Sequence, residues 1–128
     1  MYKDIFYAFF DGDDVSNTIE ILLIEGKISE AREISEKIKA ASWEIEEMLR
    51  SKSGVEVIIF GGDDLLIKYD LRFLDPAFLE TIRAAFIART GISMSCGVGS
   101  SIPSSIQSLR LAKLYGKNQI RTEGGIYG

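Results

Sequence analysis

A chain of 128 residues with 46% apolar and 27% charged residues can build the core of one domain, and a second domain is not expected. The absence of histidine excludes a histidine general base, and the single cysteine, Cys96, excludes an internal disulfide and the usual zinc-site spacings. The apolar run at the amino terminus is interrupted by acidic residues and is too short for a signal peptide or a membrane span. We therefore expect a cytoplasmic protein without membrane association.

The first fifty residues predict one strand and two helices. The apolar, aromatic-rich run 5–10 ends at an acidic loop, the pattern of a buried strand. An apolar-rich helix is predicted over 17–25, stopped by Gly26, and a second helix over 29–50, capped by Ser29. In the second helix, apolar residues recur at spacings of three and four and predict a core-facing stripe of Ile34, Ile38, Ala41, Ile45 and Met48.

The middle of the chain predicts a hairpin and a third helix. The apolar runs 55–60 and 65–69 flank a Gly-Gly-Asp-Asp segment, which is typical of two antiparallel strands joined by a tight turn. Asp75 and Pro76 indicate the start of a helix, and Gly91 indicates its end.

The last part of the chain predicts a strand, a helix and a short edge strand. Apolar residues alternate with Ser and Gly over 92–98, which favours a half-buried strand with Cys96 on its inward face. A helix is predicted over 103–115 and an edge strand over 118–122. We therefore expect one domain over 1–122 and a glycine-rich tail over 123–128.

This order of elements contains the ferredoxin-like βαββαβ arrangement of polymerase palms, an α+β fold, with extra helices. Right-handed crossovers predict that the first two strands are parallel and that the third lies between them, antiparallel to both. The end of the first strand and the tip of the hairpin then lie at the same edge of the sheet. Asp11 is therefore expected beside Asp63 and Asp64, although about fifty residues separate them.

Clustered carboxylates repel one another, and with no histidine and no basic residue beside them the natural counter-charge is a hard divalent cation, Mg²⁺ or Mn²⁺. Two such ions can activate a ribose hydroxyl and stabilise a departing pyrophosphate. Taken alone, the Gly-Gly-Asp-Asp segment is more often a simple turn, and the acidic loop 11–14 could equally cap a helix. The expected meeting of the acidic loop with the Gly-Gly-Asp-Asp segment favours a shared metal site. Gly61 and Gly62 would let the backbone turn sharply and approach a ligand closely there.

Charge is also divided along the chain. Residues 1–80 carry eighteen acidic and nine basic residues, whereas residues 81–122 carry six basic residues and no acidic one. This division suits a site in which carboxylates hold cations and basic residues meet phosphates, although ordinary surface variation explains it too. For Arg83, Arg89, Arg110 and Arg121, a solvated surface position is favoured.

Three motifs together resemble a known family. They are Asp-Gly-Asp-Asp after the first strand, the Gly-Gly-Asp-Asp hairpin, and the late run LRLAKLYGKN over 109–118. In combination they resemble the palm shared by GGDEF diguanylate cyclases and the polymerase subunit of type III CRISPR effectors, and most closely the mCpol, or minimal CRISPR polymerase, family. The resemblance covers the chain to about residue 122. The hairpin departs from the GGDEF or GGEEF pattern, so guanine specificity is not implied.

The resemblance implies site residues. Asp11, Asp63 and Asp64 would bind two metal ions and serve catalysis, and Gly12 would lend a backbone carbonyl. Lys113 matches a lysine that contacts the triphosphate, and Lys117 is a weaker phosphate candidate. Asn17 is placed to meet a base or ribose, although helix capping explains an asparagine there equally well. The predicted nucleotide-binding set is Asp13, Asp14, Asn17, Gly61, Gly62, Lys113 and Lys117.

The resemblance also implies an activity. It is a nucleotidyltransferase that joins nucleoside triphosphates, ATP favoured, into a cyclic oligonucleotide, most simply a dinucleotide, and releases pyrophosphate. The product would signal to a separate effector in anti-phage defence. One palm presents half of such a reaction, so a homodimer is expected.

The alternative activity is a non-catalytic palm that senses a nucleotide or cyclic nucleotide. A template-dependent polymerase is disfavoured because the chain is small and acidic, and no nucleic-acid template is expected. A purely structural protein would leave the acidic cluster without a reason.

Overall fold

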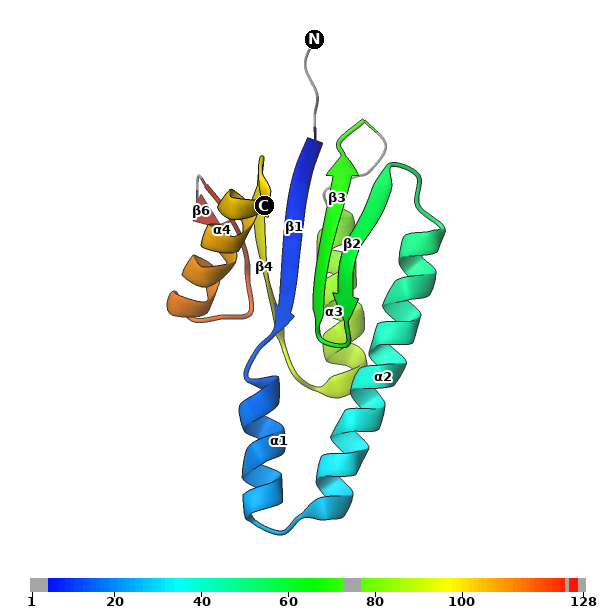
Figure 1. The fold of residues 1–128 in the computed structure, drawn as a ribbon, viewed down its shortest axis with the longest axis vertical. Helices are drawn as coiled ribbons and strands as arrows, with labels where there is room; N and C mark the ends of the chain where they lie inside the picture. The colour runs from blue at the N-terminus through cyan, green and yellow to red at the C-terminus, as the bar shows by residue number, and fades with distance from the viewer. Residues whose placement is uncertain (1–4, 73–76, 124, 127–128) are drawn as a thin grey trace.

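The computed structural model describes residues 5–72, 77–123 and 125–126. In this part of the chain, four helices accompany one six-stranded sheet with the strand order β2-β3-β1-β4-β5-β6 (Figure 1). The strands are Ile5–Gly12 (β1), Val55–Gly61 (β2), Asp64–Asp70 (β3), Met94–Gly99 (β4), Ile120–Thr122 (β5) and Gly125–Ile126 (β6). The helices are Val15–Ile24 (α1), Ile28–Arg50 (α2), Ala77–Thr90 (α3) and Ile102–Leu114 (α4).

The sheet has the topology that the sequence predicts. Strand β3 lies between β1 and β2 and is antiparallel to both, so β1 and β2 run in the same direction. Strand β4 flanks β1 on its other side, again antiparallel. The βαββαβ palm arrangement is therefore confirmed, with α1 as an extra helix that continues beyond the end of β1 (Figure 1).

The hydrophobic core lies between α2, α3 and one face of the sheet. Alternate residues of β1 and β3, such as Ala8, Phe10 and Ile67, point into it and are fully buried. The predicted stripe of α2 is confirmed: Ile38, Ala41 and Ile45 are buried, and the two flanking members pack against the same cluster. Each fully buried Ile or Phe side chain in this cluster contributes about 1.5–3 kcal/mol on burial.

Strand β4 is buried on both faces, so the prediction of a half-buried strand is wrong. Its residues on the inward face, Cys96 among them, join the core, and burial raises the pKa of the Cys96 thiol well above its usual value. The opposite face is covered by α4. A methyl group at Gly97 would stand 2.1 Å from the backbone nitrogen of Leu109, so this helix approaches as closely as a glycine allows.

The start of α2 and the edge of the sheet differ from the sequence-based predictions. Ser29 does not cap α2, because the connection after α1 is so short that the helix begins at Ile28, with Lys27 in the N-cap position. The predicted edge strand exists as β5, but β6 pairs with it and takes the edge, within the segment expected to be a tail. The predicted helix start at Asp75 and Pro76 lies outside the described residues.

The described helices include none with both the length and the apolar character needed to cross a membrane.

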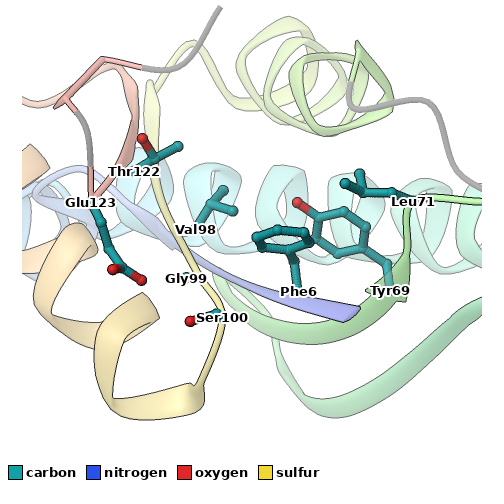
Figure 2. A pocket seen from close by; sticks show the side chains of 8 residues that line it. All are labelled: Phe6, Tyr69, Leu71, Val98, Gly99, Ser100, Thr122 and Glu123. Atoms are coloured by element: carbon teal, nitrogen blue, oxygen red, sulfur yellow. The ribbon is translucent and has the colours of Figure 1, made fainter. Parts of the chain in front are cut away.

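The two ends of the sheet differ in chemistry. At the end where β1 begins, a mainly apolar pocket of about 330 Å³ contains the paired rings of Phe6 and Tyr69, with Glu123 as the one carboxylate among its described lining residues (Figure 2). At the other end, β1 finishes and the β2–β3 turn lies beside it, bringing together the acidic segments. The two acidic segments that the sequence singles out therefore share the second end of the sheet.

We expect Gly97→Ala to lower the free energy of unfolding by about 1–3 kcal/mol, because an added methyl group would push α4 away from β4. Urea denaturation measures this effect. Ser100→Ala, an exposed change just after the same strand, should stay within about 0.5 kcal/mol of the parent protein. Equal stability of the Gly97→Ala variant and the parent would contradict the close packing described here.

Candidate active site

Strand pairing brings the two acidic segments together. Asp11 is directly opposite Asp64 in the β1–β3 ladder, and the backbone nitrogen of Gly12 donates to the carbonyl oxygen of Asp63 at 3.0 Å. Asp11 alternates with the core residue Phe10, so Asp11 and Asp64 lie on the face of the sheet that α4 partly covers. The predicted meeting of Asp11 with the hairpin acids is confirmed.

A cleft of about 350 Å³ opens at this junction. Most of the residues singled out from the sequence line it. The lining residues are Asp11, Gly12, Asp14, Val15, Ser16, Asn17, Asp63, Lys113 and Lys117. Four other predicted residues do not line the cleft: Asp64 pairs across from Asp11, Gly61 pairs with Asp64, Gly62 forms the turn with φ of 75°, and Asp13 lies buried.

Lys113 from α4 is the positive charge at the base of the cleft. Its Nζ donates to the carbonyl oxygens of Asp11 and Gly12 at 3.0 Å each and to Oδ1 of Asp13 at 2.7 Å, and it lies 3.3 Å from Oδ2 of Asp11. The expectation that no basic residue stands beside the carboxylates is therefore wrong. The sequence conceals this proximity because Lys113 is about one hundred residues away and reaches the loop only when α4 packs on the sheet.

Asp13 is a buried anchor. Its Oδ1 accepts hydrogen bonds from Lys113 and Ser95, and its Oδ2 accepts from Ser93 and from the backbone nitrogen of Asn118, at 2.7–2.9 Å. Burial acts to raise the pKa of Asp13, but these hydrogen bonds outweigh it and hold the pKa below its usual value. The carboxylate therefore fastens the acidic loop to β4 and α4. Two serines at alternate positions, Ser93 just before β4 and Ser95 within it, are the sequence signal for this role.

Asp14 and Lys117 form an exposed pair at the rim of the cleft. Both residues have left-handed backbone conformations, with φ of 59° and 63°, and Nζ of Lys117 lies 2.6 Å from Oδ2 of Asp14. Exposed pairs of this kind contribute only about 0–1 kcal/mol. The N-cap of α1 is Asp14, so Asn17 lies inside the first turn and helix capping does not explain it. Asn17 is exposed and lines the cleft.

The four arginines differ in their surroundings. Arg83 is only 9% exposed, so the favoured surface position is wrong for this residue, whose guanidinium is enclosed by hydrogen-bond acceptors. Arg89 pairs with Glu44 on the surface, and Arg110 is exposed. Arg121 is partly buried, with its guanidinium over the ring of Tyr115.

Negative charge exceeds positive charge at the site. Five carboxylates and two lysine ammonium groups gather there. Burial raises the pKa of Asp11 although Lys113 opposes it, and burial followed by the charge of Asp11 raises the pKa of Asp63.

The donors available at the cleft are carboxylate and carbonyl oxygens, which fit Mg²⁺ or Mn²⁺. Within the described residues, no three acidic, cysteine or histidine side chains are gathered closely enough to hold a metal ion. The oxygen donors and the excess negative charge are of the kind that suits a divalent cation, but in this structure the carboxylates stand apart around Lys113 instead of converging on one point.

The fold defines a palm domain with a carboxylate-lined cleft at one end of its sheet. The chain belongs to the mCpol family: the model of the minimal CRISPR polymerase domain matches residues 7–123. The comparison with curated proteins found no match.

Solved structures show the same fold. The chain is similar to the GGDEF domain of DgcB from Caulobacter crescentus in complex with c-di-GMP, with 11% identity and a TM-score of 0.59 over 92% of this chain and 77% of that chain. It is also similar to a chain of the Csm1–Csm4 cassette in complex with cA4, with 19% identity and a TM-score of 0.63 over 91% of this chain. A third relative is the diguanylate cyclase SiaD from Pseudomonas aeruginosa in complex with its activator SiaC, with 19% identity and a TM-score of 0.59 over 94% of this chain. The matches span 20% of the cassette chain and 50% of SiaD, so they establish a shared palm and not a shared whole protein.

We expect Asp13→Asn to lower the free energy of unfolding by about 3–5 kcal/mol, because it removes the buried negative charge that Lys113, two serines and a backbone amide stabilise. Asp14→Asn is the matched control, since its exposed ion pair should cost no more than about 1 kcal/mol. Urea denaturation of the two variants measures both changes. A similar loss of stability in the two would show that Asp13 does not anchor the loop.

Proposed function

We propose that the chain is a metal-dependent nucleotidyltransferase that joins nucleoside triphosphates into a cyclic oligonucleotide. The observation that supports this most directly is the excess of carboxylates where β1 meets the β2–β3 turn, in a chain of the mCpol family. Such an excess is unfavourable in the protein alone and becomes favourable when a cation and a polyphosphate bind together. A purely structural domain would gain nothing from it.

Asp11, Asp63, Asp64 and the carbonyl oxygen of Gly12 are the residues that would hold two Mg²⁺ or Mn²⁺ ions. When bound, such ions lower the pKa of an attacking hydroxyl and stabilise the charge of the departing pyrophosphate. The carbonyl of Gly12 accepts from Lys113 in this structure, so the same lysine fixes the orientation of the loop that carries Asp11.

Lys113 and Lys117 are the residues proposed to contact the phosphates of the triphosphate. Lys113 and Lys117 both line the cleft with Asp11 and Asp63. Because the Lys117–Asp14 pair is exposed, Lys117 can exchange its carboxylate partner for a phosphate at little cost. Asn17, exposed on the first turn of α1, is placed at the same cleft to meet the ribose or base.

ATP is the proposed substrate and a cyclic dinucleotide the proposed product, which would signal to a separate effector in anti-phage defence within the cytoplasm. This part of the proposal rests on membership of the mCpol family. It is consistent with similar palms whose structures contain AMPPNP or pppApApA, although the palm fold alone does not fix the base or the ring size.

The proposal predicts that the protein, incubated with each of the four nucleoside triphosphates and Mg²⁺ or Mn²⁺, forms a cyclic product visible by mass spectrometry. Asp63→Asn should reduce the rate of product formation by at least about a hundredfold, because the cleft loses a charged oxygen donor where the pyrophosphate charge develops. Glu56→Gln, which removes an exposed carboxylate from β2, should leave the rate unchanged.

Other outcomes of this experiment would favour a different function. Retention of a nucleotide without turnover would favour a sensor palm, and extension of a primer on a template would favour a polymerase. Full activity of the Asp63→Asn variant would remove the hairpin acids from the proposed chemistry.

We also propose that the active form is a homodimer with two facing sites, because one cleft of about 350 Å³ offers one set of carboxylates for a reaction between two triphosphates. Light scattering coupled to size-exclusion chromatography should give a dimer mass when ATP and Mg²⁺ are present. An enzyme that is active and strictly monomeric under the same conditions would contradict this proposal.

A further inference from the structure

Arg83 is a buried cation that the reaction chemistry does not use. It is 9% exposed on α3, and its Nε donates to the carbonyl oxygen of Met94 at 2.6 Å. Its Nη1 donates to the carboxylate of Glu80, and its Nη2 donates to Oδ1 of Asn118 at 2.6 Å. Three groups from three parts of the chain therefore fix one guanidinium plane.

Asn118 links this guanidinium to the acidic loop. Its backbone nitrogen donates to Oδ2 of Asp13 at 2.9 Å, and its φ of 50° continues the left-handed conformation of Lys117. Asparagine is one of the few non-glycine residues that adopt this conformation readily. The hydrogen bond from Arg83 holds its side-chain amide while its backbone nitrogen donates to Asp13.

The contacts continue to the cleft. Asp13 accepts from Lys113, and Lys113 donates to the carbonyl oxygens of Asp11 and Gly12. The chain of hydrogen bonds thus begins at Arg83 on α3 and ends on the backbone of the residues that carry the proposed chemistry. Each step is 2.6–3.0 Å long.

We infer that Arg83 is a positioning residue for nucleotide binding, acting through Asn118 on Lys117 and on the Asp13–Lys113 pair. The inference deepens the proposed function and rests on it for its nucleotide readout. A lysine cannot replace the arginine in this role, because a single ammonium lacks the planar fork that reaches all three acceptors at once.

The matched pair of variants is Arg83→Lys and Arg89→Lys, on the same helix. Arg89 forms a surface ion pair with Glu44, so its replacement tests the loss of an α3 guanidinium without touching the loop. Binding of a non-hydrolysable ATP analogue with Mg²⁺ is measured by titration calorimetry on folded protein. Arg83→Lys should weaken binding by at least about tenfold, and Arg89→Lys should leave it unchanged.

A double-mutant cycle with Asn118→Gly separates positioning from general destabilisation. Glycine suits the positive φ at this position while removing the acceptor of Arg83. Asn118→Gly should weaken binding of the analogue by itself, and adding Arg83→Lys should produce little further loss. Independent, multiplicative losses would overturn the inference. Should Arg83→Lys fail to fold, unchanged affinity in Asn118→Gly alone would overturn it.

Hydrogen exchange tests the same inference without nucleotide, so its failure is distinguishable from failure of the proposed function. In Arg83→Lys, the Asn118 amide that donates to Asp13 should exchange at least about tenfold faster than in the parent protein, relative to amides of the β1–β3 ladder. A uniform acceleration of all these amides, or an unchanged Asn118 amide, would reduce Arg83 to a structural residue and overturn the inference.

Discussion

The pairing of Asp11 with Asp64 across β1 and β3 is the constraint on which the site depends. Like charges directly opposite each other destabilise a sheet, and here Asp63 adds a third carboxylate at the adjoining turn. The register cannot shift by one residue to relieve them, because the same shift would expel Phe10 and its neighbours from the core. Burial of Phe10 and its neighbours on the core face therefore fixes the register. The fixed register keeps Asp11 opposite Asp64 on the other face of the sheet.

The negative charge of the carboxylates is compensated to different degrees in two places: an inner part, Asp13 with Lys113, and an outer part, Asp11 with Asp63. In the inner part, Asp13 and Lys113 neutralise each other, and every oxygen of the Asp13 carboxylate is engaged by protein donors. In the outer part, Asp11 and Asp63 keep raised pKa values, because burial and repulsion from neighbouring carboxylates exceed what Lys113 supplies. The inner part fixes the loop, and the outer part leaves a demand for positive charge that a ligand can meet.

The sequence predicted most of the fold because hydrophobic periodicity and turn residues are local signals. The order of the first three strands and the meeting of Asp11 with the hairpin followed from one general rule of crossover handedness. It did not predict that Lys113 contacts the loop or that Arg83 is buried, because each contact joins residues far apart in the chain. The burial of β4 on both faces was missed for a similar reason, since α4 follows it in sequence and only packing shows where it lies.

The basic segment that follows residue 80 therefore does not act as one uniform surface for phosphate. Arg83 lies deepest and is held by three protein acceptors. Lys113 joins the buried Asp13 to the cleft, and Lys117 stands at the rim in a weak pair. The more deeply one of these cations is buried, the less readily it can change partners. A buried ionic hydrogen bond is costly to break, and an exposed one is not. Under the proposed function, an incoming triphosphate would therefore recruit Lys117 first, while the deeper cations keep the acidic loop in place.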